Sequence, residues 1–172
     1  MNYKRRILKG FWVWGQFDAN STKRIINNQQ EINNTLKGPK FDVHITLSGP
    51  ISNLDNSVKL KLNQISNSFS PIRLFSEGID MKDEFFQSLF FRIKKNKDLL
   101  NLKMKIDDEL VLGSKNYFPH ISLYYGDAKK DIKMESMRNI KGLSDVILEK
   151  ISLVDVDETI NSWKVVETYS LF

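Results

Sequence analysis

The feature that most constrains this 172-residue chain is a pair of short segments, each carrying one of its two histidines. They are residues 43–49 (VHITLSG) and 119–126 (PHISLYYG). In both, a hydroxyl residue follows the histidine two places later: Thr46 follows His44, and Ser122 follows His120. Successive side chains of a strand point to opposite faces, so each segment presents an imidazole and a hydroxyl together. Apolar residues fill the other face, which predicts two half-buried strands that carry a functional site.

Two imidazoles held on opposite sides of a phosphodiester can catalyse its cleavage. One activates water and the other protonates the departing oxygen, and an unperturbed pKa of about 6.5 suits histidine to both tasks. Thr46 and Ser122 would donate hydrogen bonds to the phosphate oxygens as charge builds on them. A serine hydrolase is disfavoured, because neither Ser48 nor Ser122 lies in a Gly-x-Ser-x-Gly turn.

Composition narrows the chemistry further. The net charge of +5 favours anionic ligands such as nucleotides or RNA. The absence of cysteine excludes thiolate metal ligands and a cysteine nucleophile, and two histidines are too few for a structural zinc site. We therefore expect no metal and no cofactor. No apolar run approaches membrane-spanning length, so we expect a cytoplasmic monomer with no membrane partner.

Periodicity and turn signals predict the order of the elements. We expect a strand at 10–17, a helix at 21–36 capped by Asp18 or Asn20, the first histidine strand, and a helix from Asp55 that ends before Pro71. A hairpin (72–81 and 87–93), a helix (98–112), the second histidine strand, a helix (127–139) and two strands (146–156 and 163–171) follow. One histidine strand lies near the middle of each half. This order predicts a single two-lobed α+β domain over residues 1–172, in which each lobe contributes one histidine strand to a shared cleft.

The two His-x-Thr/Ser motifs resemble those of the 2H phosphoesterase superfamily. Further matches at 13–14, 38–41, 85–87, 117–125 and 157–163 make the chain similar to the cyclic phosphodiesterase family. That family is typified by plant enzymes that open ADP-ribose 1'',2''-cyclic phosphate and nucleoside 2',3'-cyclic phosphates. Val43 stands where the family usually has proline, and the cysteines of plant members are missing.

The resemblance implies a fold, an activity and site residues. The fold would be two antiparallel sheets with outer helices around a central cleft. The activity would be metal-independent hydrolysis of a ribose cyclic phosphate to a phosphomonoester, with His44, His120, Thr46 and Ser122 as catalytic residues. By the same resemblance, His120 would activate water and His44 would act as the acid.

Aromatic residues are the expected contacts for a nucleotide base. The resemblance points to Tyr125, although strict strand alternation would put Tyr124 on the histidine face; a bulge near Gly126 would reconcile the two. Trp14 and Phe86 are further substrate-binding candidates, with core packing as the alternative for both. Trp163 is assigned to the core.

Other interpretations of the same residues stay open. Related enzymes act on RNA ends, on 2',5'-oligoadenylate or on cyclic oligonucleotides, so the substrate is either a cyclic nucleotide or one of these. A non-catalytic RNA-binding module on the same fold is the alternative from another class. Such a module need not keep both imidazoles and both hydroxyls.

Overall fold

The structure is a computed structural model that describes residues 9–113 and 116–172. In chain order its elements are β1 (Gly10–Phe17), α1 (Ala19–Leu36), β2 (Ile45–Ile51), α2 (Asn56–Ser66), β3 (Ile72–Met81), the 3-10 turn η1 (Phe85–Gln87), β4 (Leu89–Ile93), α3 (Lys97–Glu109), β5 (His120–Tyr124), α4 (Lys130–Ser136), β6 (Asp145–Val156), the 3-10 turn η2 (Ile160–Ser162) and β7 (Lys164–Ser170).

The strands form one hydrogen-bonded, antiparallel set in the order β1-β2-β5-β4-β3-β6-β7, and β1 also pairs with β6. The long strand β6 joins the two halves, because its first residues pair with β3 and its later residues pair with β1 and β7. On the other side, β2 and β5 meet at a single register pair, Ile45 with Ile121. The two sheets implied by the resemblance are thus joined at both ends. The strands at the thinner junction are β5, which begins at His120, and β2, which begins at Ile45, so His44 directly precedes its strand and does not lie within it as predicted.

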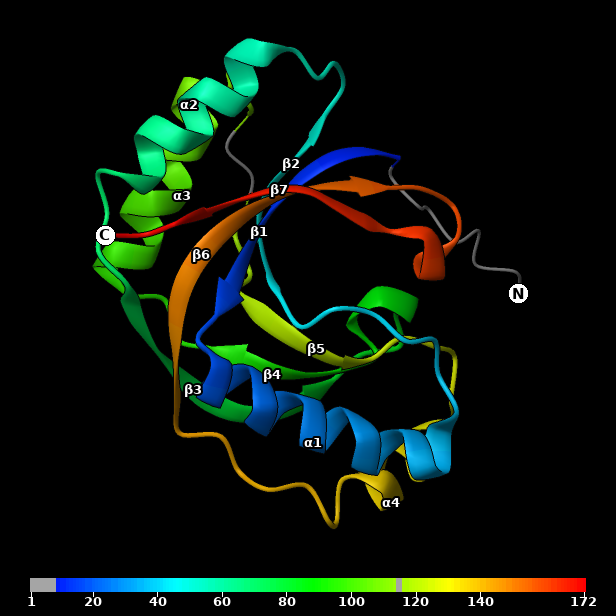
Figure 1. The fold of residues 1–172 in the computed structure, drawn as a ribbon. Helices are drawn as coiled ribbons and strands as arrows, with labels where there is room; N and C mark the ends of the chain where they lie inside the picture. Colours follow the sequence, from blue (N-terminus) through cyan, green and yellow to red (C-terminus); the bar gives the residue numbers. More distant parts are fainter. Residues whose placement is uncertain (1–8, 114–115) are drawn as a thin grey trace.

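Two helices accompany each group of strands (Figure 1). Helix α1 packs against β5 and α4, whereas α2 and α3 pack against each other and against β2, β6 and β7. Figure 1 shows α1 and α4 together at one end of the molecule and α2 and α3 side by side at the other. This arrangement has the α+β, two-lobed character that the sequence predicts.

Short polar side chains fix where three helices begin. The Asp18 carboxylate accepts a hydrogen bond from the backbone N–H of Ser21, Asp55 accepts from Ser57 and Val58, and Asn96 accepts from Leu99. Each side chain satisfies a backbone donor that the first helical turn leaves unpaired. Asp18 is therefore the cap of α1, and Asn20 lies inside the helix.

Some predicted boundaries are wrong. The second hairpin strand begins at Leu89 and not at residue 87, because Phe85–Gln87 form a 3-10 turn closed by a bond from the Gln87 N–H to the Glu84 carbonyl (3.1 Å). Helix α4 is confined to Lys130–Ser136 within the predicted 127–139. In the described part of the chain, no helix is long and apolar enough to cross a membrane.

Candidate active site

A cavity of about 430 Å3 contains both histidines. Its lining consists of Trp12, Trp14, His44, Thr46, Glu84, Phe86, Gln87, His120, Tyr125, Val156 and Trp163. Of the seven residues predicted for the site, only Ser122 is not part of this lining.

The two imidazoles are held in the same way. Nδ1 of His44 lies 2.7 Å from the carbonyl oxygen of Asp42, and Nδ1 of His120 lies 2.9 Å from that of Phe118. A carbonyl oxygen only accepts, so Nδ1 carries the proton in both rings. Nε2 is then the nitrogen that can take up or release a proton. Each histidine thus bonds to the residue two places before it, and each is fixed in the tautomer that acid–base catalysis requires.

His44 is enclosed by aromatic surface. Its ring stacks on Trp14 with centroids 3.6 Å apart and planes 6° from parallel, and only 6% of the residue is exposed. The pKa of His44 is lowered to about 4, mainly by burial; the hydrogen bond to Asp42 opposes this shift and the charge of His120 adds to it. In this structure His44 is therefore neutral at pH 7.

His120 is half-buried and has charged neighbours. Its ring packs at 5.3 Å from Phe90 and 5.5 Å from Phe118. Burial is the main cause that lowers its pKa; the hydrogen bond to Phe118 and the charge of Glu84 oppose the shift, and the charge of Lys82 adds to it. A cation therefore lies close to the second histidine, where an anionic group would be attracted.

The two hydroxyl residues differ in position. Thr46 lines the cavity, as its place two residues after His44 predicts. Ser122 is buried, and its hydroxyl donates to the carbonyl of Phe86 in η1 at 3.4 Å. Ser122 therefore differs from Thr46: it is not part of the cavity lining, and its hydroxyl is bonded to the protein backbone.

Tyr125 lines the cavity because it lies beyond the end of β5. The strand stops at Tyr124, and Gly126 adopts a φ of +153°, which L side chains rarely reach. The Gly126 N–H donates to the carbonyl of Phe85. Strand alternation therefore does not apply to Tyr125, whose ring stacks on Phe41 at 3.9 Å. Burial raises the pKa of its hydroxyl, so the phenol stays neutral.

Trp163 packs against a small buried cluster of Trp14, Val154 and Val156, as its assignment to the core predicts, and it also lines the cavity. Its ring centroid lies 5.8 Å from Trp14, 6.0 Å from Tyr125 and 6.1 Å from Phe86. These four rings form an aromatic wall. Trp163 follows η2, and its indole N–H donates to the carbonyl of Asp157, which turns the ring toward the cavity. The family resemblance at 157–163 ends on Trp163, and it is the sequence signal that could have indicated this role.

Other residues that line the cavity were not among the predicted site residues, namely Trp12, Glu84, Gln87 and Val156. Gln87 lies within the resemblance at 85–87, and Glu84 directly precedes it. Lys82 donates to the Gln87 side-chain oxygen at 2.5 Å and lies 4.2 Å from the centre of the Phe118 ring. The turn before β4 thus supplies polar groups to the site.

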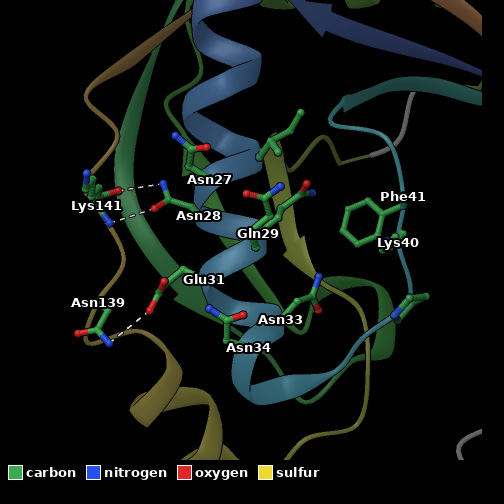
Figure 2. Close-up of a pocket in the computed structure, with 13 residues that line it drawn as sticks. Asn27, Asn28, Gln29, Glu31, Asn33, Asn34, Lys40, Phe41, Asn139 and Lys141 are labelled. Carbon is green, nitrogen blue, oxygen red and sulfur yellow. Dashed lines mark hydrogen bonds between the residues drawn. The ribbon is translucent and has the colours of Figure 1, made fainter.

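A second, larger cavity of about 900 Å3 lies along α1 (Figure 2). Its wall is rich in asparagine and glutamine, and it contains none of the predicted site residues. The most buried of these amides, Asn28, already bonds to the backbone N–H and carbonyl of Lys141, as Figure 2 shows. In the parts of the chain that the structure describes, no group of three or more His, Cys, Asp or Glu side chains is arranged to hold a metal ion.

Comparisons with known proteins agree with this geometry. Residues 15–171 match the model of a family described as "Cyclic phosphodiesterase-like protein". Among solved structures, TT0787 of Thermus thermophilus is similar with a TM-score of 0.68 at 13% identity, over 94% of this chain and 97% of that one. Comparison with curated protein sequences gave no match.

Escherichia coli LigT is also similar. Its complex with NADP+ gives a TM-score of 0.66 at 11% identity, and its complex with 3'-AMP gives 0.63 at 10%. In both comparisons 95% of this chain and 98% of LigT are covered. The fold and the family match define this chain as a 2H phosphoesterase. Within that superfamily it belongs to the cyclic phosphodiesterase-like family.

Proposed function

We propose that this protein hydrolyses a ribose cyclic phosphate, either a nucleoside 2',3'-cyclic phosphate or ADP-ribose 1'',2''-cyclic phosphate, to a phosphomonoester. The observation that carries the proposal is the shared orientation of His44 and His120. Both line one cavity, and both bond through Nδ1 to a carbonyl, which leaves Nε2 for proton transfer. General acid–base catalysis by two such groups requires no metal.

The reaction balances with these groups alone. The base removes a proton from water as the water oxygen bonds to phosphorus. The bond from phosphorus to one ribose oxygen breaks, and the acid gives that oxygen its proton. The products are a phosphomonoester and a free ribose hydroxyl. Thr46 donates to a non-bridging oxygen as charge builds, and Ser122 joins it after leaving the Phe86 carbonyl.

The electrostatics of the cleft favour one division of roles. Burial is the main cause that lowers the pKa of His44 to about 4, and the charge of His120 contributes to that shift, so protonation of His120 favours a neutral His44. On this basis His44 is the base and His120 is the acid. This is the reverse of the division that the resemblance implies.

The cavity suits a single nucleotide. Its volume of about 430 Å3 lies within the range of about 300–1,000 Å3 typical of small-molecule sites. Within the aromatic wall, Phe86 and Trp163 are partly exposed and offer faces on which a base can stack, whereas Trp14 and Tyr125 are buried against His44 and Phe41. The similarity in fold to LigT, solved in complex with 3'-AMP and with phosphate, also supports a nucleotide ligand.

A direct assay tests the proposal. The purified protein is incubated with 2',3'-cyclic nucleotides, ADP-ribose 1'',2''-cyclic phosphate, an RNA with a 2',3'-cyclic end, 2',5'-oligoadenylate and a cyclic dinucleotide. We expect turnover of at least one ribose cyclic phosphate, lowered at least about a hundredfold by His44→Ala. Turnover of only 2',5'-oligoadenylate or the cyclic dinucleotide would contradict the proposed substrate and would identify an oligonucleotide phosphodiesterase instead. RNA binding without any turnover would instead support a binding module.

A further inference from the structure

Strand β2, which begins directly after His44, and strand β5, which begins at His120, are joined to each other weakly. Strand β2 pairs with β1 at four register positions, and β5 pairs with β4 at four, but β2 and β5 share only Ile45 with Ile121. Ladder hydrogen bonds alone therefore give little control over the separation of His44 and His120. Another contact across this junction is needed to fix it.

The hydroxyl of Tyr117 supplies such a contact. It donates to the backbone carbonyl of Thr46 at 3.1 Å. Thr46 stands two residues after His44, and Tyr117 directly precedes Phe118, whose carbonyl accepts the hydrogen bond from His120. One bond thus ties the backbone that carries the first histidine to the backbone that orients the second.

A buried ion pair on α3 holds Tyr117 in place. The Lys103 ammonium lies 5.2 Å from the centre of the Tyr117 ring and donates to Asp107 at 2.5 Å. The other oxygen of Asp107 accepts from the hydroxyl of Ser48, which lies on β2. Lys103, Asp107 and Ser48 are all buried. The network therefore runs from β2 through α3 to Tyr117 and returns to β2 at Thr46.

Stability of the fold does not by itself explain a buried network of this kind. A buried ion pair often stabilises a fold no more than apolar side chains of the same size, although a fully bonded one can fix geometry. Burial raises the pKa of Tyr117, and the charge of Asp107 raises it further, so the phenol keeps its proton and remains a donor. We propose that Tyr117 is a positioning residue that sets the separation of the two imidazoles, with Ser48, Lys103 and Asp107 holding it.

Kinetics give the first test, which rests on the proposed function. Tyr117→Phe removes only the hydroxyl, and we expect kcat to fall about tenfold with KM within about twofold, because misplaced acid–base groups slow the chemical step more than binding. Tyr169→Phe is the matched control, since Tyr169 is a buried tyrosine of β7 that does not line the cavity. It should keep wild-type kcat. An equal loss of kcat in both variants would overturn the proposal.

The two histidines allow a second test that needs no substrate. Their imidazole signals are followed by NMR as pH is varied, and the wild type should show His44 titrating near 4. In Tyr117→Phe a looser junction admits water to the ring, so the pKa of His44 should move toward its ordinary value of 6.5. Tyr169→Phe should leave it in place.

Ser48→Ala removes a different link of the same network and should shift the His44 pKa in the same direction. It replaces Tyr117→Phe if that variant does not fold. Wild-type kcat and an unmoved His44 titration in the variant tested would overturn the proposal. If the wild type turns over no cyclic phosphate but the titration moves, the proposed function fails while the positioning role stands.

Discussion

The two halves of the site share a local arrangement and differ in their surroundings. In the first half-site, His44 and Thr46, the imidazole lies flat against Trp14 and is almost fully buried. In the second, His120 and Ser122, the imidazole is half-buried between Phe90 and Phe118, with the charges of Lys82 and Glu84 nearby. The same local hydrogen bond fixes the tautomer of both imidazoles, whereas burial and neighbouring charges differ between the two.

The hydroxyls repeat this contrast. Thr46 lines the cavity, whereas Ser122 is not part of the lining and is bonded to the Phe86 carbonyl. Equivalent sequence spacing therefore does not give equivalent access to a ligand. The first half-site has its hydroxyl in place, and the second must rearrange.

Removal of either imidazole should have the largest effect and should be nearly symmetric. We expect His44→Ala and His120→Ala each to lower kcat by at least about a hundredfold, because each removes one proton-transfer partner. Steady-state kinetics measure this, with circular dichroism to show that the fold is intact. Near wild-type turnover in either variant would show that the two half-sites do not act as a pair.

Stability in acid should separate the half-sites. Native His44 has a pKa of about 4 against an ordinary 6.5, so the unfolded chain binds a proton that the native state excludes. The wild type therefore loses stability as pH falls from 6.5 toward 4, by up to about 3 kcal/mol from this group. Urea unfolding of His44→Gln should show a flatter decline across this range.

His120→Gln is the matched comparison for this measurement. Its effect on the acid decline should be smaller, because a half-buried imidazole keeps more of its contact with water. Equal flattening by both variants would contradict the asymmetry between the half-sites.

The two hydroxyls should differ less, but in a defined order. We expect Thr46→Ala to lower kcat about tenfold and Ser122→Ala about threefold, since Thr46 alone is already placed to donate to developing charge. A larger loss in Ser122→Ala would show that the second half-site rearranges fully when substrate binds.

The smallest effect should come from chelation. Activity should persist in excess EDTA, because a chain with two histidines and no cysteine offers few of the ligands that a dedicated site for a transition metal needs. The assay compares initial rates with and without EDTA. Loss of activity that returns with an added divalent ion would contradict this expectation.

The sequence predicted the elements and the histidine pair because these depend on local patterns. Alternation around His44 and His120 and the cap at Asp18 can be inferred from neighbouring residues. The family match and the fold confirm the resemblance that those patterns suggested.

What the sequence could not predict depends on contacts between distant segments. The indole N–H of Trp163 donates to the Asp157 carbonyl in the turn between β6 and β7. The hydroxyl of Ser122 donates to the Phe86 carbonyl, 36 residues away in the chain. The alternation of strand side chains does not apply to Tyr125, because β5 ends one residue earlier, at Tyr124. Spacing along the chain records none of these contacts.

The measurement that tests the account most directly is the pH dependence of kcat/KM for the wild type and the two histidine variants. One imidazole must be neutral while the other is protonated, so the wild type should give a bell, with limbs that belong to the coupled pair. Because burial lowers both pKa values, the bell should lie on the acidic side of neutrality. Residual activity of His44→Ala should lose the acidic limb and that of His120→Ala the alkaline limb. Loss of the opposite limbs would restore the division implied by the resemblance, and a wild-type profile that is flat from about pH 5 to pH 9 would contradict proton transfer by either histidine.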